Sequence, residues 1–549
     1  MRKNTFAQID GGAVFTAPLF IYCDFTGGRF YGIDGERKFK GEDFGRLFDE
    51  LRRIRAARLQ HFRSTEPELL VIVNDLNVFA VFIQKYIGAA QSAGEKESFG
   101  STHTLEIKAG GFIFRSFNFI ANAKPEKIAD FLEVKNPVQA MELFCKKLAG
   151  KKKLHSLRWS LAHITKKSFY KPISAELWQR MKEEDVFFHS FQHWQDMFAG
   201  NKSGALLHFS DPDQKHRKVI TNVTSFDKKS AYTSVFLNDE RFPLSRPIRV
   251  MKDKGAALSN AIKERHWFKI VMRRKDTPEL RPFQDADDRE LIGIEYYDFM
   301  LLRDVLGVSS QRFAEILNAG KWSLYVCNHT GYLDDNFRRR IAEYFVQKEA
   351  IKDKKNFYRF TIKTQMEMMF GKALQRKNFR TVKEVNRYYT GRGDNYLMPQ
   401  HSMHAIAAVR YELMKAVQLC GSDCIAYDTD GIKVTGSGRI FDALNELIKI
   451  KNERAGYPQL KIGFWMKEWT AQRFLQVCTK SYLYDDQGRI EVKHAGISEE
   501  DFRKYTDTLP EGTDLIEHFQ TQRTIQVKGK FAFIPEQNRF IRIVNNFTF

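Results

Sequence analysis

Two carboxylates one residue apart lie between apolar runs in residues 425–434, which read IAYDTDGIKV. In an extended strand, residues i and i+2 project to the same face, so Asp428 and Asp430 would point the same way. Two carboxylates on one face repel each other unless a cation lies between them, which suits this spacing to a divalent metal. Asp, Thr and Gly also favour turns, so a polar hairpin turn is the alternative interpretation.

A further carboxylate, Asp227, closes the apolar run of residues 219–227 (VITNVTSFD), and Lys-Lys-Ser-Ala-Tyr follows it. An Asp in this position either begins a helix as its N-cap or contributes to a metal site. The tripeptide Lys480-Ser481-Tyr482 follows another apolar run. Taken alone, it carries little information.

One stretch with helical periodicity carries cations and an aromatic ring on a single face. Arg359, Lys363 and Phe370 stand at i, i+4 and i+11. Such a face could bind a triphosphate at its cationic end and stack a base at its aromatic end. A solvated Lys and a core Phe are the alternative interpretation.

Strands and helices must hold these residues in place. Hydrophobic periodicity predicts an amino-terminal α/β region and a polar boundary near residues 200–217. The elements that we expect are strands at 20–25, 68–73, 112–119 and 219–226, helices at 44–59, 336–376 and 401–419, and a strand–turn–strand at 424–434.

The composition points to a polyanionic partner. Lys and Arg exceed Asp and Glu by 88 to 67, a formal charge of +21, and the 13% aromatic content argues against a disordered basic chain. No stretch reaches the roughly 20 apolar residues of a membrane span, and the first residues, MRKNTFAQID, lack the apolar core of a secretory signal. The six cysteines form no zinc-type spacing. We therefore expect a cytoplasmic protein of a bacterial or phage-infected cell, with no membrane partner.

Taken in order, these features resemble the motifs of family B DNA polymerases, in the protein-primed branch of small phages and linear plasmids. Residues 227–232 match DxxSLYP, 363–372 match KxxxNSxYGK, 426–431 match YxDTDS, 480–482 match KxY, and 492–496 (VKHAG) match a motif near the thumb. The order is colinear from about residue 200 to the end.

The resemblance implies a role for each matched position. Asp227 and Asp428 would hold two Mg²⁺ ions, for which Mn²⁺ could substitute, and Asp430 would support them. Tyr232 would form the wall that excludes a ribose 2′-OH. The remaining implied contacts are with the incoming nucleotide, from Arg359, Lys363 and Phe370, and with the primer end, from Lys480 and Tyr482.

The sequence departs from the polymerase pattern at several positions. Glu367 and Met368 replace the Asn and Ser of the third motif, and Gly431 replaces the Ser of YxDTDS. Glu367 follows Lys363 by four residues, so an ion pair is the simple interpretation. If Glu367 instead faces the nucleotide, it opposes triphosphate binding. Neither Gly431 nor Thr233, which replaces the Pro of SLYP, removes a metal ligand.

The amino-terminal region resembles the proofreading exonuclease domain of these enzymes in degenerate form. Asp24 is retained, but Thr26 replaces the Glu of the first motif and Phe79 replaces the Asp of the second. Glu184 is an ambiguous match to the third motif, whose Tyr is absent. Two-metal hydrolysis needs several carboxylates, so we expect an exonuclease-like fold without 3′–5′ exonuclease activity.

We therefore predict an α/β and α+β multidomain chain with a right-hand polymerase fold and an amino-terminal RNase H-like domain. The expected division is an exonuclease-like domain (1–200), palm (201–260 and 399–480), an insertion contacting a priming protein (261–345), fingers (346–377), a short second insertion (378–398) and thumb (481–549).

The predicted function is DNA-directed DNA polymerisation from dNTPs on a primer 3′ or protein hydroxyl, with template and primer DNA and a separate priming (terminal) protein as partners. One alternative is a template-independent or self-primed nucleotidyltransferase of a defence or mobile element. Glu367 and the degenerate exonuclease motifs favour it. The other is a catalytically silent nucleic-acid-binding subunit, which the retained Asp227, Asp428 and Asp430 disfavour.

Overall fold

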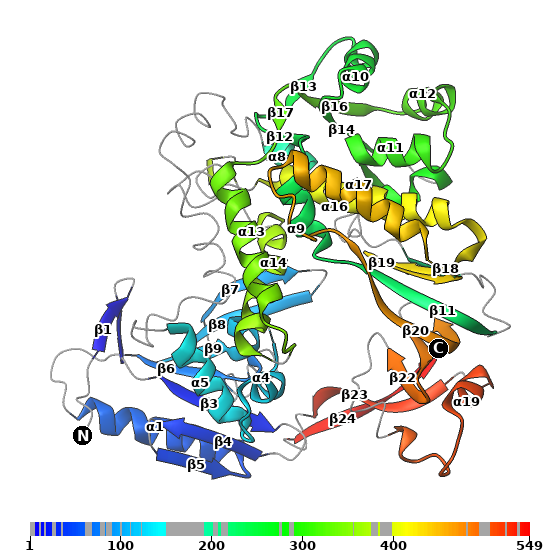
Figure 1. Cartoon of the computed structure of the whole chain (residues 1–549). Coiled ribbons are helices and arrows are strands. Elements are labelled where there is room, and N and C mark those ends of the chain that lie inside the picture. The colour runs from blue at the N-terminus through cyan, green and yellow to red at the C-terminus, as the bar shows by residue number, and fades with distance from the viewer. Residues whose placement is uncertain are drawn as a thin grey trace.

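The computed structural model places most of the chain in three mixed regions joined by long helices (Figure 1). No helix among the described residues is long and apolar enough to cross a bilayer. The structure describes all residues except 1–5, 10–11, 16–17, 25–28, 35–36, 61–67, 77–78, 80–82, 84–90, 99–100, 110, 122, 150–190, 201–206, 210–217, 274–276, 285–289, 355, 375–380, 382, 385–397, 437, 479–480, 494–504, 522–523, 535–538 and 549.

The amino-terminal domain is a seven-stranded sheet with helices on both faces. Its order is β5-β4-β3-β6-β9-β8-β7, with β3, β6 and β9 mutually parallel and the other pairs antiparallel. One apolar cluster lies between the sheet and α1, and a second lies between the sheet and α3 to α5. The elements are β3 (Leu19–Asp24), β4 (Arg29–Asp34), β5 (Arg37–Gly41), α1 (Phe44–Leu59), β6 (Leu69–Val73), β7 (Gln91–Ser98), β8 (Ser101–Ala109), β9 (Phe112–Ser116), α3 (Phe117–Ala121), α4 (Pro125–Leu132) and α5 (Pro137–Ala149).

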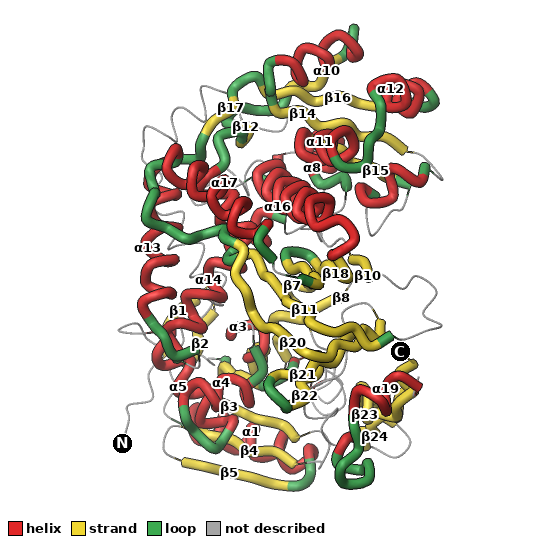
Figure 2. The backbone as a smooth tube through the Cα atoms, turned by 45° about the vertical axis from the view of Figure 1, so that its right-hand side comes forward, coloured by secondary structure: helices red, strands yellow, loops and turns green. Residues whose placement is uncertain are grey.

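A second seven-stranded sheet, the central sheet, has the order β10-β18-β19-β11-β20-β21-β22 and is antiparallel throughout. Helices α16 and α17 lie together on one of its faces (Figure 2). The elements are β10 (Leu207–Phe209), β11 (Val219–Lys228), α9 (Ala231–Asn238), α16 (Pro399–Cys420), β18 (Cys424–Asp428), β19 (Gly431–Thr435), α17 (Ile440–Arg454), β20 (Trp465–Cys478), β21 (Ser481–Asp486) and β22 (Arg489–Lys493).

Between β11 and α16 the chain forms a smaller four-stranded sheet, ordered β13-β16-β14-β15, and then two long helices. The helices and strands from β12 to α14 are β12 (Phe242–Pro243), β13 (Ile248–Val250), α10 (Lys254–Lys263), β14 (Trp267–Arg273), β15 (Leu291–Glu295), α11 (Tyr296–Asp304), α12 (Ser310–Asn318), β16 (Trp322–Cys327), β17 (Thr330–Gly331), α13 (Asp335–Ala350) and α14 (Phe357–Ala373). Of these, β12 and β17 pair with each other outside the four-stranded sheet. The remaining elements are β1 (Phe6–Ile9), β2 (Gly12–Phe15), α8 (Phe191–Met197), α19 (Leu515–Thr521), β23 (Thr524–Ile534) and β24 (Arg539–Thr548).

The expected elements are present, with differences in extent. The strand expected over residues 112–119 ends at Ser116, and residues 117–121 form the helix α3. The helical pattern of residues 336–376 forms two helices, because α13 ends at Ala350 and Asn356 caps a new one by accepting from the amide of Tyr358 at 2.9 Å. The strands β21 and β22 extend the central sheet, although they lie beyond residue 481, where we expected the thumb to begin. Most of the expected second insertion, residues 378–398, lies outside the described residues.

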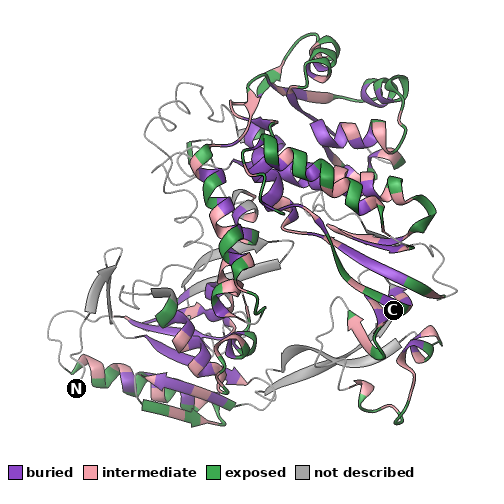
Figure 3. Cartoon of the chain, viewed as in Figure 1, coloured by how far each residue is buried: buried purple, intermediate pink, exposed green. Residues whose placement is uncertain are grey.

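Side-chain alternation gives the central sheet two different faces. Phe226, Ile432 and Val434 pack beneath α16 and α17. Because successive strand residues alternate, Asp227, Gly431 and Lys433 lie on the opposite face, which we call the carboxylate face. Buried residues are concentrated in the strands of both large sheets and in α16 (Figure 3).

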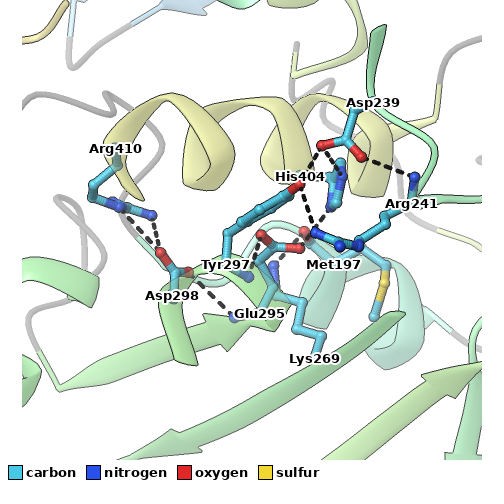
Figure 4. Close-up of polar contacts among 9 residues, drawn as sticks. All are labelled: Met197, Asp239, Arg241, Lys269, Glu295, Tyr297, Asp298, His404 and Arg410. Atoms are coloured by element: carbon cyan, nitrogen blue, oxygen red, sulfur yellow. Dashed lines mark hydrogen bonds and ion pairs between the residues drawn. The ribbon is translucent and has the colours of Figure 1, made fainter. Parts of the chain in front are cut away.

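A buried polar network joins α16 to the four-stranded sheet (Figure 4). His404 on α16 is fully buried, with Nδ1 3.1 Å from Glu295 Oε2 and Nε2 3.4 Å from Asp239 Oδ2. Burial alone would lower the pKa of His404, but the two carboxylates raise it to about 9. The hydroxyl of Tyr297 also donates to Asp239, at 2.6 Å. Nearly two helix turns further along α16, Arg410 Nη2 pairs with Asp298 at 2.7 Å. The network therefore fixes α16 by charged contacts as well as apolar ones.

We predict that His404→Leu lowers the free energy of unfolding by about 3 kcal/mol at pH 6, because it leaves two buried carboxylates without their cation. The pKa of His404 is higher in the folded state than in the unfolded one, so its stabilisation is complete below about pH 6.5 and is lost as the pH rises through about 9. Urea unfolding of both proteins at pH 6 and pH 9.5 measures this effect. An equal difference at the two pH values would contradict it.

Candidate active site

Asp227 and Asp428 flank one glycine across three neighbouring strands. Asp227 on β11 lies opposite Gly431 on β19, and Asp428 on β18 lies opposite the same Gly431 from the other side. Directly opposed residues of an antiparallel pair point to the same face, so both carboxylates project from the carboxylate face, with backbones about 10 Å apart. A Cβ on Gly431 would lie 3.5 Å from Asp227 Oδ1, an ordinary contact, so the Ser of the polymerase motif would also fit there.

Asp430 is in the two-residue turn that joins β18 to β19. Thr429 has a positive φ of 58°, and its hydroxyl donates to Asp428 Oδ1 at 2.8 Å. The amide of Lys228 donates to the carbonyl of Asp430 at 2.9 Å. This hydrogen bond holds the turn that carries Asp430 against the end of β11, next to Asp227.

The charges around Asp227 disfavour its ionised form in the absence of a bound cation. Burial, followed by the negative charges of Asp430 and Glu468, raises the pKa of Asp227 to about 8. Burial and the charge of Asp428 raise the pKa of Asp430 to about 6. Crowded carboxylates of this kind are expected where a cation is to be bound.

Lys433 provides one positive charge inside this group. Its side chain is buried, and its Nζ lies 4.4 Å from the centre of the Tyr482 ring. Burial lowers the pKa of Lys433, and the charges of Asp428, Glu468 and Asp227 oppose that shift. The carboxylate of Glu468 accepts from Ser225 Oγ at 3.2 Å.

The donor set suits Mg²⁺ in chemistry, since carboxylate oxygens are the ligands that this ion prefers. Within the part of the chain that the structure describes, no three carboxylate, imidazole or thiol groups are gathered closely enough to hold a metal ion. The side chains of Asp227 and Asp428 would therefore have to turn toward a common centre to bind one. The two side chains project from the same face of the sheet, on either side of Gly431, and so can turn toward a point above that glycine.

A second charged group supports the strand behind the aspartates. Lys228 is almost completely buried and forms an ion pair with Glu412 on α16. Glu412 also pairs with Lys451 on α17, at 2.7 Å. These contacts attach the end of β11 to both helices of the opposite face.

Helix α14 brings one of its two expected nucleotide-binding cations toward the aspartates. The charge of Lys363 opposes the rise that burial causes in the pKa of Asp227, and its Nζ lies 3.5 Å from Glu367 Oε1 in an exposed ion pair. Arg359, the other expected cation, contacts the end of α13. Its guanidinium donates to the carbonyls of Lys348 and, at 2.7 Å, of Ile351, at the end of α13.

Tyr232 and Tyr482 both lie near the carboxylates. Tyr232 is in the first turn of α9, and burial and the charge of Asp430 raise its pKa. Tyr482, on β21, is part of an aromatic group with Trp469, Phe474 and Tyr484, and the centroids of Trp469 and Tyr484 are 4.1 Å apart. The side chain of Phe370 and the whole of Lys480 lie outside the described residues.

The exonuclease-motif positions differ in environment. Asp24 is the last residue of β3, which pairs with β4 on one side and, in parallel, with β6 on the other. Phe79 is fully buried and stacks on Phe48 with ring centroids 5.5 Å apart. Its position is therefore part of an apolar core. Thr26 and Glu184 lie outside the described residues.

Two residues of the site, Lys433 and Glu468, were not found from the sequence. Lys433 follows Gly431 by two residues in a strand, so period-two alternation could have placed it on the carboxylate face. Glu468 lies where the register between β20 and β11 shifts, between the partners of Ser225 and Phe226. A bulge of this kind reverses the facing of the following residues, and no simple sequence pattern reveals it.

Solved structures of phi29 DNA polymerase match almost the whole chain. The complex of that enzyme with single-stranded DNA has a TM-score of 0.61 at 13% identity, over 97% of this chain and 100% of that one. Its ternary complex with primer-template DNA and incoming nucleotide substrates has a TM-score of 0.58 at 12% identity, over 97% and 99%. No family model matches the sequence, and no curated protein does. The protein thus has the fold of phi29 DNA polymerase, and the fold predicted from its motifs, that of a family B polymerase of the protein-primed branch, is confirmed.

Proposed function

We propose that the protein is a DNA-directed DNA polymerase that adds dNTPs to a primer hydroxyl. The observation that carries the proposal is the register that sets Asp227 and Asp428 on either side of Gly431, on the face toward which Lys363 of α14 contributes positive charge. The fold match to an enzyme solved with primer-template DNA and nucleotides supports it. The +21 charge of the chain also favours a nucleic-acid partner.

Asp227 and Asp428 would hold two Mg²⁺ ions, with Mn²⁺ as a substitute. When bound, such ions lower the pKa of the attacking hydroxyl and neutralise charge on the leaving pyrophosphate. Asp430 raises the negative potential at the site and so attracts the cations. Lys433 and Lys363 moderate that potential while the carboxylates are without metal.

The other residues bind and orient the reactants. Lys363 is exposed, and its charge acts on Asp227, so we assign it to the triphosphate. Tyr232, on whose pKa the charge of Asp430 acts, is assigned as the wall against a 2′-OH that the resemblance implies. Tyr482 and its aromatic neighbours offer a surface for the primer end. We assign Arg359 to the junction of α13 and α14 instead of the triphosphate, because two carbonyls already accept its guanidinium protons.

We further propose that the enzyme lacks 3′–5′ proofreading. The position that matches the second exonuclease carboxylate is Phe79, which is enclosed by Phe48 and Phe114 and cannot ligate a metal. A separate priming protein, contacted by residues 261–345, remains part of the proposal through the resemblance of the motifs.

The alternative, template-independent or self-primed synthesis, is favoured by one contact. Glu367 pairs with Lys363 at 3.5 Å and so competes with a triphosphate for the same cation. A weakened hold on the nucleotide would reduce the advantage of template-guided incorporation.

The first prediction of the proposal concerns catalysis. With Mg²⁺, dNTPs and a primed template, the protein should copy the template, and Asp428→Asn should slow extension by more than about 100-fold because it removes a metal ligand. Asp442→Asn, which removes the same charge from an exposed position on α17, is the matched control. Template-free product attached to protein would favour the alternative. No incorporation in any lane, with DNA binding intact, would support the silent subunit.

The second prediction concerns proofreading. Labelled single-stranded DNA incubated with the protein and Mg²⁺, without dNTPs, should keep its length, and Asp24→Asn should behave as the wild type does. Shortening from the 3′ end that disappears in Asp24→Asn would show that the amino-terminal domain is a working exonuclease.

The third prediction concerns Glu367. Its replacement by Gln should lower the KM for dNTPs about two- to fivefold, because it releases Lys363 from an exposed ion pair. Glu343→Gln, which removes a paired charge from α13, is the control. Steady-state incorporation at varied dNTP concentration gives both values, and an unchanged or higher KM in Glu367→Gln would disprove the competition.

A further inference from the structure

The first turn of α14 is inserted into the core of the amino-terminal domain. Phe357, the first residue of the helix, is 9% exposed and belongs to the apolar cluster that lies between that domain's sheet and α3 to α5. Phe360, one turn later, packs against the same cluster. In Figures 1 and 2 this end of α14 reaches α4 and α5.

Aromatic and cationic contacts define this interface. The rings of Phe360 and Phe131 on α4 stack with centroids 4.6 Å apart at 30°, and Phe357 meets Phe144 on α5 edge-on at 5.6 Å. Lys147 on α5 lies over the Phe357 ring, with Nζ 5.5 Å from its centre. Aromatic pairs and cation–π contacts of this geometry stabilise beyond their buried area, so the contact is specific.

The other end of α14 is anchored in the apolar core that α9 and α16 share with the four-stranded sheet. Met366 and Met369 are buried in the cluster that also contains residues of α9 and α16. The hydroxyl of Thr233 on α9 donates to the carbonyl of Met366 at 3.5 Å. Lys363 lies between the two anchors and is exposed. The distance along the helix from Phe357 to Met369 is about 18 Å.

A rigid helix held at both ends has a fixed orientation, whereas one held only at its inner end could tilt. Arg359 adds a third restraint, since it attaches α14 to the end of α13. Loosening the outer anchor would displace Lys363 relative to Asp227, because Lys363 lies between the outer anchor and the inner one.

We propose that the amino-terminal domain positions α14, with Phe131 and Phe144 as positioning residues that hold Lys363 toward the carboxylates and so toward the incoming nucleotide. This role rests on the proposed polymerase function. It gives the domain a part in nucleotide binding that does not need exonuclease chemistry.

The test compares Phe131→Ala with Phe39→Ala. Phe39 is also a partly buried ring of the amino-terminal domain that packs on another phenylalanine, Phe30, but it belongs to the cluster on the other face of the sheet and does not touch α14. Phe131→Ala should raise the KM for dNTPs about fivefold with kcat changed by less than about twofold, and Phe39→Ala should change neither. Phe131→Tyr, which keeps the stacked ring, should restore the wild-type KM.

Hydrogen–deuterium exchange of the full chain gives a readout that does not depend on activity. Amides of residues 357–363 should exchange about fivefold faster in Phe131→Ala than in the wild type, and those of residues 399–420 should not change. Unchanged exchange in α14 would overturn the proposal whether or not the protein polymerises DNA. Equal KM changes in Phe131→Ala and Phe39→Ala would also overturn it, because they would indicate general loosening of the domain. A wild type that exchanges as expected but incorporates no dNTP would instead disprove the polymerase function.

Discussion

The antiparallel register of β18, β19 and β11 is the constraint on which the site depends. It sets Asp227, Gly431 and Asp428 opposite one another, and the same alternation turns Phe226 and Ile432 toward α16 and α17. A slip of one residue would exchange the two sets, burying carboxylates under helices and exposing the core. The apolar packing of the central sheet and the assembly of the carboxylates are therefore enforced by one arrangement.

Placing several carboxylates beside an apolar core costs free energy of folding. Cations from separate segments of the chain offset this cost. Lys433 comes from β19, Lys363 from α14, and the Lys228–Glu412–Lys451 group joins β11 to α16 and α17. Lys228 is next to Asp227 in sequence, but its charge is directed to the other face, where it pairs with Glu412. The electrostatic balance of the site is thus a property of the fold, and no single motif contains it.

This explains which parts could be predicted from the sequence. Asp227, Asp428 and Asp430 stand at strand ends and in a turn, where local pattern determines position, and the structure places them on neighbouring strands and in the turn between two of those strands. Phe79 was recognised as unable to bind metal from its side chain alone, and it lies in the core. Arg359 shares a helical face with Lys363, but helical spacing does not reveal that α13 ends at Ala350 and presents its carbonyls to that guanidinium. Glu468 depends on a register shift in β20, which no local pattern reveals, whereas alternation from Gly431 could have placed Lys433.

The amino-terminal domain shows that an apolar side chain at position 79 is compatible with its fold. A carboxylate at position 79 would have to be accommodated among Phe48 and Phe114, where burying its charge without a cation is costly. Phenylalanine at that position enlarges the apolar cluster on one face of the sheet. The other face receives Phe357 of α14. Apolar packing around Phe79 on one face and the docking of α14 on the other therefore both stabilise the same sheet.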